Sequence, residues 1–248
     1  MGGLAGKVAV LTGSGTGIGR SSAIALANEG ANIVINYSKS ESEALATVAD
    51  IEKLGVKAIA IKANVSVRLE AEKLIADAHA AFGRIDVLVN SAGTTRFIAF
   101  PDLDKLDDEV WESIMSTNLM AAFYTSRAAS RHMLTQGDGV IINISSVAGV
   151  NGFGSSLPYA VSKGAMITLT KSLARALAPV VRVNTVAPGV VGTRWIGDQQ
   201  SFKDAQAAQT PMGRIATPED VAAAVRYFAV DATFVTGQVH IVDGGRII

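Results

Sequence analysis

Two side chains that could exchange a proton with a substrate stand four positions apart in the second half of the chain. Tyr159 and Lys163 lie near the start of a predicted helix, which places both on one face of it. A free tyrosine has a pKa of about 10, too high for acid–base work near neutrality. A lysine ammonium about 4 Å away would contribute roughly 4 kcal/mol at an effective dielectric near 20, enough to lower that pKa by about three units. The pair therefore predicts a tyrosine that acts as general acid or base.

The spacing of this pair is weak evidence by itself, because many exposed helix edges carry a tyrosine and a lysine four residues apart by chance. Ser146 adds a third polar group, thirteen residues before Tyr159, at the end of the predicted strand Val140 to Ile144. The functional interpretation therefore depends on the motifs that accompany these three residues.

A glycine-rich turn near the N-terminus is typical of a dinucleotide site. Glycines let the backbone approach a pyrophosphate closely, while free amides and the positive end of a helix dipole face the phosphates. The turn follows a predicted strand, precedes a predicted helix and offers as candidate coenzyme contacts Gly13, Ser14, Thr16, Gly17, Ile18 and Gly19. The sequence holds no Walker A lysine, GxSxG elbow or HExxH pair, which leaves phosphoryl transfer, serine hydrolysis and zinc proteolysis without support.

The segment after the second predicted strand bears on the choice of coenzyme. Folds that prefer NAD usually place an acid about 20 residues after the glycines, where it holds the ribose 2′-hydroxyl. This chain has Asn36, Tyr37, Ser38 and Lys39 there. No carboxylate among them would repel a 2′-phosphate, and Ser38 and Lys39 could donate to one, so NADP is preferred over NAD. Lys39 could equally be a solvated loop lysine.

The elements that must position these residues alternate along the chain. Short β-branched runs separated by helical periodicity predict βαβ units, and no repeat, low-complexity segment or Pro/Ser linker divides them. The predicted strands are 8–11, 33–35, 58–61, 87–89, 140–144, 181–186 and 239–242. The predicted helices are 18–29, 41–54, 67–82, 111–135, 159–177 and 218–229, the last with Thr217 as N-cap. We expect an α/β fold in a single domain over residues 1–248: a Rossmann-type, doubly wound sheet of seven parallel strands with helices on both faces.

Three connections are longer than packing requires, and each follows the carboxyl end of a strand. They span 94–107, 148–158 and 188–218. Ligands of open α/β sheets bind at those ends, so these loops should form the walls of a substrate pocket. The aromatic residues expected to line it are Phe97, Phe153, Trp195 and Phe202, whereas Trp111 is expected to pack.

Composition excludes several classes of partner. Lys and Arg total 22 and Asp and Glu total 22, so no net field would hold a nucleic acid or an anionic membrane. The chain has no cysteine, no apolar run of about 18 residues, and a short Gly-rich start from Met1 to Lys7 without a secretory signal, so a cytoplasmic protein is expected. The histidines, His79, His132 and His240, are scattered among different predicted elements, and no metal site is expected.

Taken together, the motifs match one enzyme family over essentially the whole length. With the glycine turn, Asn90-Ser91-Ala92-Gly93, Asn118, Ser146, Tyr159, Lys163, Pro188-Gly189 and Val242-Asp243-Gly244-Gly245, the chain resembles a short-chain dehydrogenase/reductase, in the 3-oxoacyl reductase-like branch. The resemblance implies that hydride passes between a nicotinamide coenzyme and a ketone or secondary alcohol while Tyr159 exchanges the proton.

The resemblance also assigns roles by position. Lys163 would bond the nicotinamide ribose, Ser146 would orient the substrate oxygen, and Asn118 would support a proton relay to the lysine. By itself Asn118, which follows Thr117, could simply cap a helix. Ser145 competes with Ser146, but the offset of thirteen residues to the tyrosine favours Ser146. Further coenzyme contacts are expected from Tyr37, Ser38, Lys39, Asn64, Val65, Asn90, Ala92, Gly93, Tyr159, Lys163, Pro188, Gly189, Val191 and Thr193.

Three positions depart from the family pattern. Ser91 stands where a second asparagine is usual, which weakens a local hydrogen-bond expectation but not the fold. Asn64 replaces an aspartate before Val65, and its amide oxygen could still accept from the adenine amino group. Thr16 replaces a basic residue common in members that prefer NADP.

Two functions of different kinds follow from these observations. The first is an NAD(P)-dependent oxidoreductase acting on a small ketone or alcohol, because 132–139 offers no Lys or Arg for docking a carrier-protein-bound 3-oxoacyl chain and includes Asp138. The second is a non-catalytic NAD(P)-binding regulatory protein, which the intact tyrosine, lysine and serine disfavour. The resemblance further predicts a homotetramer in which the apolar helices 111–135 and 159–177 pack across a two-fold axis.

Overall fold

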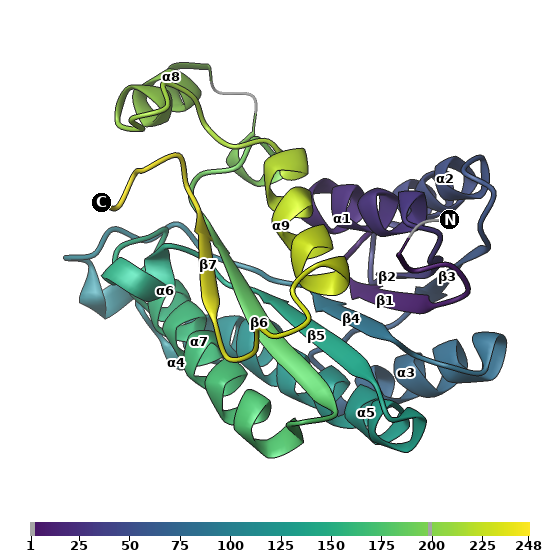
Figure 1. The fold of residues 1–248 in the computed structure, drawn as a ribbon. Coiled ribbons are helices and arrows are strands. Elements are labelled where there is room, and N and C mark those ends of the chain that lie inside the picture. The colour runs from purple at the N-terminus through teal and green to yellow at the C-terminus, as the bar shows by residue number, and fades with distance from the viewer. Residues whose placement is uncertain (1–2, 198–199) are drawn as a thin grey trace.

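A sheet of seven parallel strands runs through the molecule in the order β3-β2-β1-β4-β5-β6-β7 (Figure 1). The structure is a computed structural model that describes residues 3–197 and 200–248, so Met1, Gly2 and residues 198–199 of the third long connection lie outside it. The strands are β1 (Val8–Thr12), β2 (Asn32–Tyr37), β3 (Ala58–Lys62), β4 (Val87–Asn90), β5 (Gly139–Ile144), β6 (Val181–Pro188) and β7 (Val239–Val242). Every predicted strand is contained in one of these, and the predicted α/β class is confirmed.

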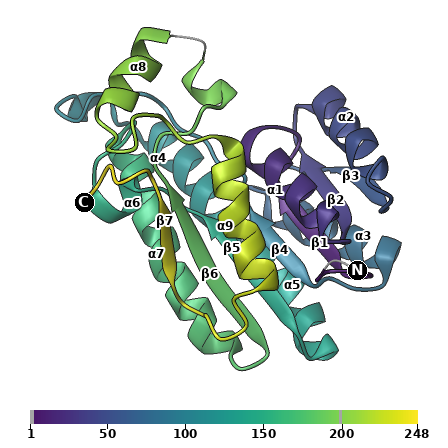
Figure 2. The same cartoon turned by 45° about the horizontal axis from the view of Figure 1, so that its top comes forward.

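Helices cover both faces of the sheet (Figures 1 and 2). One face carries α1 (Gly17–Asn28), α2 (Glu41–Glu52) and α9 (Pro218–Val230), and the other carries α3 (Arg68–Phe82), α5 (Ala121–Gln136) and α7 (Leu157–Leu177). The predicted helix 111–135 is two helices: α4 (Asp108–Met115) passes into α5 through a π-helical turn at Ser116–Met120. The long connections contain short elements that the sequence did not predict, namely η1 (Leu103–Lys105), α6 (Ala148–Asn151), η3 (Arg194–Ile196) and α8 (Gln200–Ala208).

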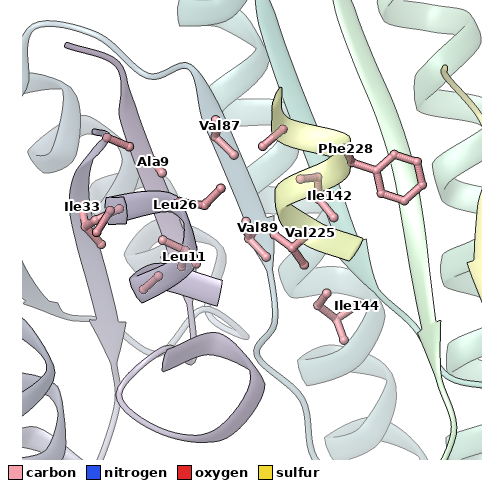
Figure 3. Close-up of a cluster of buried hydrophobic side chains, with 14 of the residues drawn as sticks. Ala9, Leu11, Leu26, Ile33, Val87, Val89, Ile142, Ile144, Val225 and Phe228 are labelled. Carbon is pink, nitrogen blue, oxygen red and sulfur yellow. The ribbon is translucent and has the colours of Figure 1, made fainter. Parts of the chain in front are cut away.

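The central strands β1, β4 and β5 are buried and mostly apolar because helices cover both of their faces. In β1, Ala9 and Leu11 join the core under α1 and α9, while Val8 and Val10 join the core on the opposite face. Figure 3 shows Leu26 of α1 and Phe228 of α9 lying over the first of these cores. The alternation fixes which face each strand residue occupies, and with it the register of the strand ends.

The strand order reverses between β1 and β4, and the glycine turn meets the segment after β4 at that point. The Thr12 hydroxyl accepts hydrogen bonds from the backbone amides of Ser91 and Ala92, each at 3.1 Å. These backbone contacts hold the chain after β4 against the end of β1. Such a reversal is where doubly wound sheets bind their ligands.

Helix α9 begins with the capping arrangement that its sequence predicts. The Thr217 hydroxyl accepts from the amide of Asp220 at 3.3 Å, and the Asp220 carboxylate accepts from the amide of Thr217 at 2.7 Å. Pro218 occupies the first turn. The reciprocal pair ends the third long connection at a defined residue.

The three histidines lie on three different elements, as predicted, but two of them are in contact. The rings of His79 on α3 and His132 on α5 stack with centroids 4.0 Å apart. Burial lowers the pKa of His132, and the charges of His79 and Arg131 lower it further. Within residues 3–197 and 200–248, no three His, Cys, Asp or Glu side chains are grouped to hold a metal ion. The helices of the same ranges include none that is long and apolar enough to cross a membrane.

Candidate active site

Lys163 ties the first turns of α7 to the end of β5. Its ammonium donates a hydrogen bond to the carbonyl of Ile144, the last residue of that strand, at 2.9 Å, and the residue is only 4% exposed. Burial lowers the pKa of Lys163 to about 8. The ammonium lies 5.7 Å from the centroid of the Tyr159 ring, so the two side chains do share one side of the helix.

The acidity of Tyr159 differs from the sequence prediction. Burial raises the pKa of Tyr159 above its ordinary value, and a hydrogen bond with Ser146 opposes that rise without cancelling it. The predicted lowering by Lys163 is therefore wrong for the chain by itself, because excluding water from the phenolate outweighs the attraction of an ammonium that faces the ring. At neutral pH Tyr159 consequently holds its proton and is poised to donate it.

Of the two adjacent serines, Ser146 is the one that meets Tyr159. Ser146 Oγ accepts from the amide of Ala148 at 3.1 Å and lies 3.5 Å from the Pro188 carbonyl, beside the tyrosine hydroxyl. Ser145 Oγ is turned onto α7, where it donates to the carbonyl of Lys163 at 2.8 Å. Ser146 thus faces Tyr159, and Ser145 anchors the helix.

Gly149 explains how the loop after β5 comes so near α7. A β-carbon at this position would overlap the backbone of Lys163 and lie 2.6 Å from the amide nitrogen of Gly164. Only a glycine permits α6 to pack this closely on α7. That packing brings the Ser146 loop to the tyrosine and lysine.

Asn118 is fully buried in the π-helical turn and does not cap a helix. Its Oδ1 accepts from the amide of Thr94 at 2.7 Å, and its Nδ2 donates to the Thr94 carbonyl at 3.0 Å and to Ser162 Oγ at 2.9 Å. These bonds engage the whole side-chain amide. A β-carbon on Gly93 would lie 3.4 Å from Asn118 Oδ1 and 3.7 Å from Lys163 Nζ, so Gly93 sits between the asparagine and the lysine.

The glycine turn forms a cradle that a dinucleotide fits. Gly13 has φ +59°, and a β-carbon there would stand 2.8 Å from Ala92 Cα. A β-carbon on Gly19 would stand 2.7 Å from Ser14 Cα, and one on Gly17 would stand 3.4 Å from Thr193 Cγ2. The glycines therefore let the turn pack closely against its neighbours at the start of α1, where the end of a helix favours a phosphate group.

Two predicted coenzyme contacts have side chains that hold the fold together. Ser14 is fully buried, and its Oγ donates to the carbonyl of Leu11 at 2.7 Å and accepts from the amide of Asn36 at 3.2 Å. Asn90 Nδ2 donates to Asn143 Oδ1 at 2.8 Å inside the sheet. Ser14 and Asn90 can therefore offer a coenzyme only their backbone groups.

Asn64 also has its side chain engaged. Its Oδ1 accepts from both the amide and the hydroxyl of Ser66, at 3.2 and 2.8 Å. This is the oxygen that was expected to accept from an adenine amino group, so an adenine would have to share it with Ser66. Val65 beside it is buried, 5% exposed.

The end of β2 holds a carboxylate that the sequence interpretation missed. The buried Tyr37 donates its hydroxyl to Glu41, four residues later in the first turn of α2, at 2.8 Å. Ser38 and Lys39 between them are exposed. Residues 36–39 themselves hold no carboxylate, but Glu41 lies close to them and accepts the Tyr37 hydroxyl at Oε1.

The remaining predicted contacts follow β6. The amide of Gly189 donates to the carbonyl of Val242 at 3.0 Å, and Val191 forms a parallel bridge with Ala216. At the opposite side of the crevice, Thr16 precedes α1 in an extended conformation, and Ile18 packs against the core under that helix.

Of the aromatic side chains predicted to line the pocket, Trp195 contacts Tyr159. Trp195 makes an edge-to-face contact with the tyrosine ring, with centroids 6.1 Å apart. Phe153 stacks on Phe100 at 5.0 Å, a partner that was not predicted, and Phe97 is 67% exposed. Phe202 lies on α8 and Trp111 on α4.

Comparison with known proteins agrees with this arrangement. A family model described as Enoyl-(Acyl carrier protein) reductase matches residues 13–246. The 3-oxoacyl-[acyl-carrier-protein] reductase of Synechocystis sp. is 40% identical over 99% of this chain and 98% of its own. The L-rhamnose 1-dehydrogenase (NAD(P)(+)) of a Sphingomonas sp. is 38% identical over 99% of this chain and 98% of its own.

The fold agrees as well. A short-chain type dehydrogenase/reductase from Mycobacterium ulcerans superposes with a TM-score of 0.90 and 29% identity, covering 98% of this chain and 90% of that one. The glycine cradle, the tyrosine with its lysine and serine, and these likenesses agree on one conclusion: the chain belongs to the short-chain dehydrogenase/reductase family, in its 3-oxoacyl reductase-like branch, and is an NAD(P)-dependent oxidoreductase.

Proposed function

We propose that the protein reduces a ketone of the 3-oxoacyl type to a secondary alcohol with NADPH as the reductant, and that residues 1–248 act as one coenzyme-binding and catalytic domain. The coenzyme supplies the hydride. Tyr159 donates the proton to the carbonyl oxygen, and Ser146 holds that oxygen by a hydrogen bond. Lys163 holds its positive charge beside the phenol and stabilises the phenolate that remains.

The meeting of Ser146 and Lys163 at Tyr159 is the observation that carries this proposal. The serine reaches the hydroxyl of the tyrosine, and the ammonium lies 5.7 Å from the centre of its ring. Because burial keeps Tyr159 protonated at neutral pH, the site is prepared for reduction in particular. A regulatory protein that only bound the coenzyme would have no need of these buried polar groups.

The preference for NADPH rests on the segment after β2. Ser38 and Lys39 are exposed there and can donate hydrogen bonds to a 2′-phosphate. Glu41, the nearby acid, is engaged with the Tyr37 hydroxyl. That hydrogen bond uses Oε1 alone, so the preference for NADPH rests on the donors Ser38 and Lys39.

The relatives support the 3-oxoacyl class, and the surface before β5 favours a small free ketone over a carrier-bound one. The Synechocystis relative is named for a 3-oxoacyl group on a carrier protein. In the present chain, residues 132–139 hold no Lys or Arg, and the carboxylate of Asp138 is 70% exposed. An acidic carrier protein would meet no complementary charge on this segment.

Tyr159→Phe tests the proposal, with Tyr227→Phe as the matched control on α9. We expect wild type and Tyr227→Phe to oxidise NADPH when ethyl acetoacetate is added, and Tyr159→Phe to lose at least a hundredfold in kcat while binding NADPH as before. Full turnover by Tyr159→Phe would refute the assigned proton donor. A wild-type protein that binds NADPH yet reduces no ketone would favour the regulatory alternative.

We also propose that the protein is a cytoplasmic homotetramer in which α4, α5 and α7 contribute to a two-fold interface. Val161 on α7 and Leu134 on α5 remain 44% and 46% exposed. Exposed apolar side chains on neighbouring helices are suited to packing against a second copy. The cytoplasm supplies the nicotinamide coenzyme. Light scattering at micromolar concentration should give four times the chain mass, and a monomer mass would contradict the assembly.

A further inference from the structure

The segment from Val191 to Gly197, here called the strap, crosses the carboxyl ends of the strands between β6 and α8 (Figures 1 and 2). Its base is fixed by backbone contacts. Val191 bridges to Ala216, the amide of Gly192 donates to the Ala216 carbonyl at 2.8 Å, and the amide of Ala216 donates to the Val190 carbonyl at 2.9 Å. The strap therefore starts from a defined position just before α9.

The middle of the strap reaches the opposite side of the coenzyme crevice. Thr193 lies against Gly17 of the glycine turn, where a β-carbon would stand 3.4 Å from its methyl group. Arg194 pairs with Glu43 of α2 at 3.3 Å. Both side chains of this pair are exposed, so the pair adds little stability.

Between these anchors, the indole of Trp195 is directed into the reaction site. Its ring stands at 77° to the ring of Tyr159, with centroids 6.1 Å apart. The tip of the indole, Cη2, would be 3.6 Å from a β-carbon on Gly93, the same position that lies 3.7 Å from Lys163 Nζ. The residue is nevertheless 46% exposed, so one part of the indole touches the catalytic tyrosine and another part faces outward.

We propose that Trp195 is a specificity-determining residue that admits ketones with a slim substituent beside Tyr159 and rejects those with a bulky one. The inference rests on the proposed function. A ketone carbon carries two substituents, and its oxygen must reach both Tyr159 and Ser146 to be protonated. The approach to the tyrosine is narrowed by the indole on one side.

The opposite wall adds to this restriction. A β-carbon on Gly154 would lie 3.3 Å from Cδ1 of Tyr159, so the loop before α7 lies directly against the tyrosine ring. The Thr95 and Ser155 hydroxyls are 2.6 Å apart and the Ile98 amide donates to the Ser155 carbonyl at 3.0 Å, which joins this wall to the loop after β4. Because two loops are hydrogen-bonded to each other in this wall, it is more rigid than a single loop would be. The indole is therefore the part of the entrance whose size one substitution can change.

Two 3-oxo esters test this size selection by Trp195, here called the filter, because they differ at one substituent. Ethyl acetoacetate carries a methyl group on the ketone, and ethyl benzoylacetate carries a phenyl group. The readout is the ratio of kcat/KM for the phenyl ester to that for the methyl ester, with NADPH saturating. Trp195→Ala should raise this ratio at least tenfold over wild type, chiefly by lowering KM for the phenyl ester. Trp195→Phe should change it less than threefold.

Phe234→Ala is the matched control, because Phe234 is fully exposed between α9 and β7, at the opposite end of the strands. It should leave the ratio unchanged. Melting temperature and NADPH affinity establish that each variant is folded. If Trp195→Ala is unfolded, Trp195→Leu replaces it, and the same increase in the kcat/KM ratio is expected. An unchanged ratio in a folded variant that still reduces ethyl acetoacetate overturns the filter and leaves the chemistry of Tyr159 standing. Failure of every variant and of wild type to reduce either ester overturns the proposed function and the filter with it.

Discussion

Replacing Lys163 with methionine should stabilise the protein at neutral pH while abolishing its activity. Burial lowers the pKa of this lysine from 10.5 to about 8. A shift of one unit corresponds to about 1.4 kcal/mol, so keeping the ammonium charged costs the folded state roughly 3 kcal/mol at pH 7. Methionine fills the space of the aliphatic stem and removes the charge. Loss of the hydrogen bond to the Ile144 carbonyl destabilises the variant by about 1 kcal/mol, which leaves a net increase of about 2 kcal/mol in its free energy of unfolding.

The gain must depend on pH in a defined direction. Between about pH 8 and pH 10.5 the unfolded chain keeps a proton on Lys163 that the folded chain has released, so the free energy of unfolding of wild type rises with pH across this window. Below about pH 8 both states are charged, and the full cost applies. The advantage of Lys163→Met should therefore be complete at pH 7 and should vanish near pH 10.

Urea unfolding at several pH values measures this difference directly. At pH 7 the gain corresponds to an increase in melting temperature of about 4–8 °C for a chain of this size. Lys171→Met is the control, because Lys171 is an exposed lysine on the same helix, and it should change stability by no more than about 0.5 kcal/mol. A Lys163→Met protein that is less stable than wild type at pH 7, or one whose advantage is the same at every pH, would refute the reasoning.

Three further predictions concern activity and the cradle. Ketone reduction should decline above about pH 8, because it needs the charged form of Lys163. Measuring kcat/KM from pH 6 to 10 tests this, and a constant value across that range would contradict it. Gly19→Ala should weaken NADPH binding at least tenfold in a fluorescence titration, because its β-carbon would stand 2.7 Å from Ser14 Cα. Gly55→Ala, where φ is +85° and no atom lies within 4 Å of a β-carbon, should lose stability but bind NADPH normally. Asn118→Ala should lower the free energy of unfolding by about 1–3 kcal/mol in urea, since it strands the backbone groups of Thr94, and an unchanged value would contradict that role.

The regular part of the fold could be predicted from sequence because its causes are local. Most strands are β-branched runs that are largely buried, so their limits are visible in the chain. Strand β7 is partly exposed, yet it begins and ends where predicted. The start of α9 is equally local, since Thr217 and Asp220 form the cap within four residues. The π-helical turn at Asn118 could not be predicted in this way, because a shift of one hydrogen bond leaves the apolar periodicity of the helix nearly unchanged.

The placing of two site residues relative to each other could be predicted from the sequence, whereas the direction of the pKa shift of Tyr159 could not. The spacing of Tyr159 and Lys163 placed both side chains on one side of α7. The direction of the tyrosine pKa depends on how completely water is excluded, and this is decided by the Ser146 loop and by Gly149 packing on α7 from another part of the chain. The Glu41 contact with Tyr37 was missed because two side chains four residues apart meet across the end of a strand.

The catalytic groups and the strap come from separate stretches of the polypeptide. Tyr159 and Lys163 belong to α7, whereas Trp195 belongs to a separate segment held by the Val191–Ala216 bridge, by the contact of Thr193 with Gly17 and by a surface ion pair. Exchange of a few consecutive codons could therefore retune what the protein accepts while its proton-transfer machinery stays intact. Such independence would allow similar chains to act on different substrates, and enzymes named for 3-oxoacyl and for L-rhamnose substrates are nearly equally similar to this chain, at 40% and 38% identity.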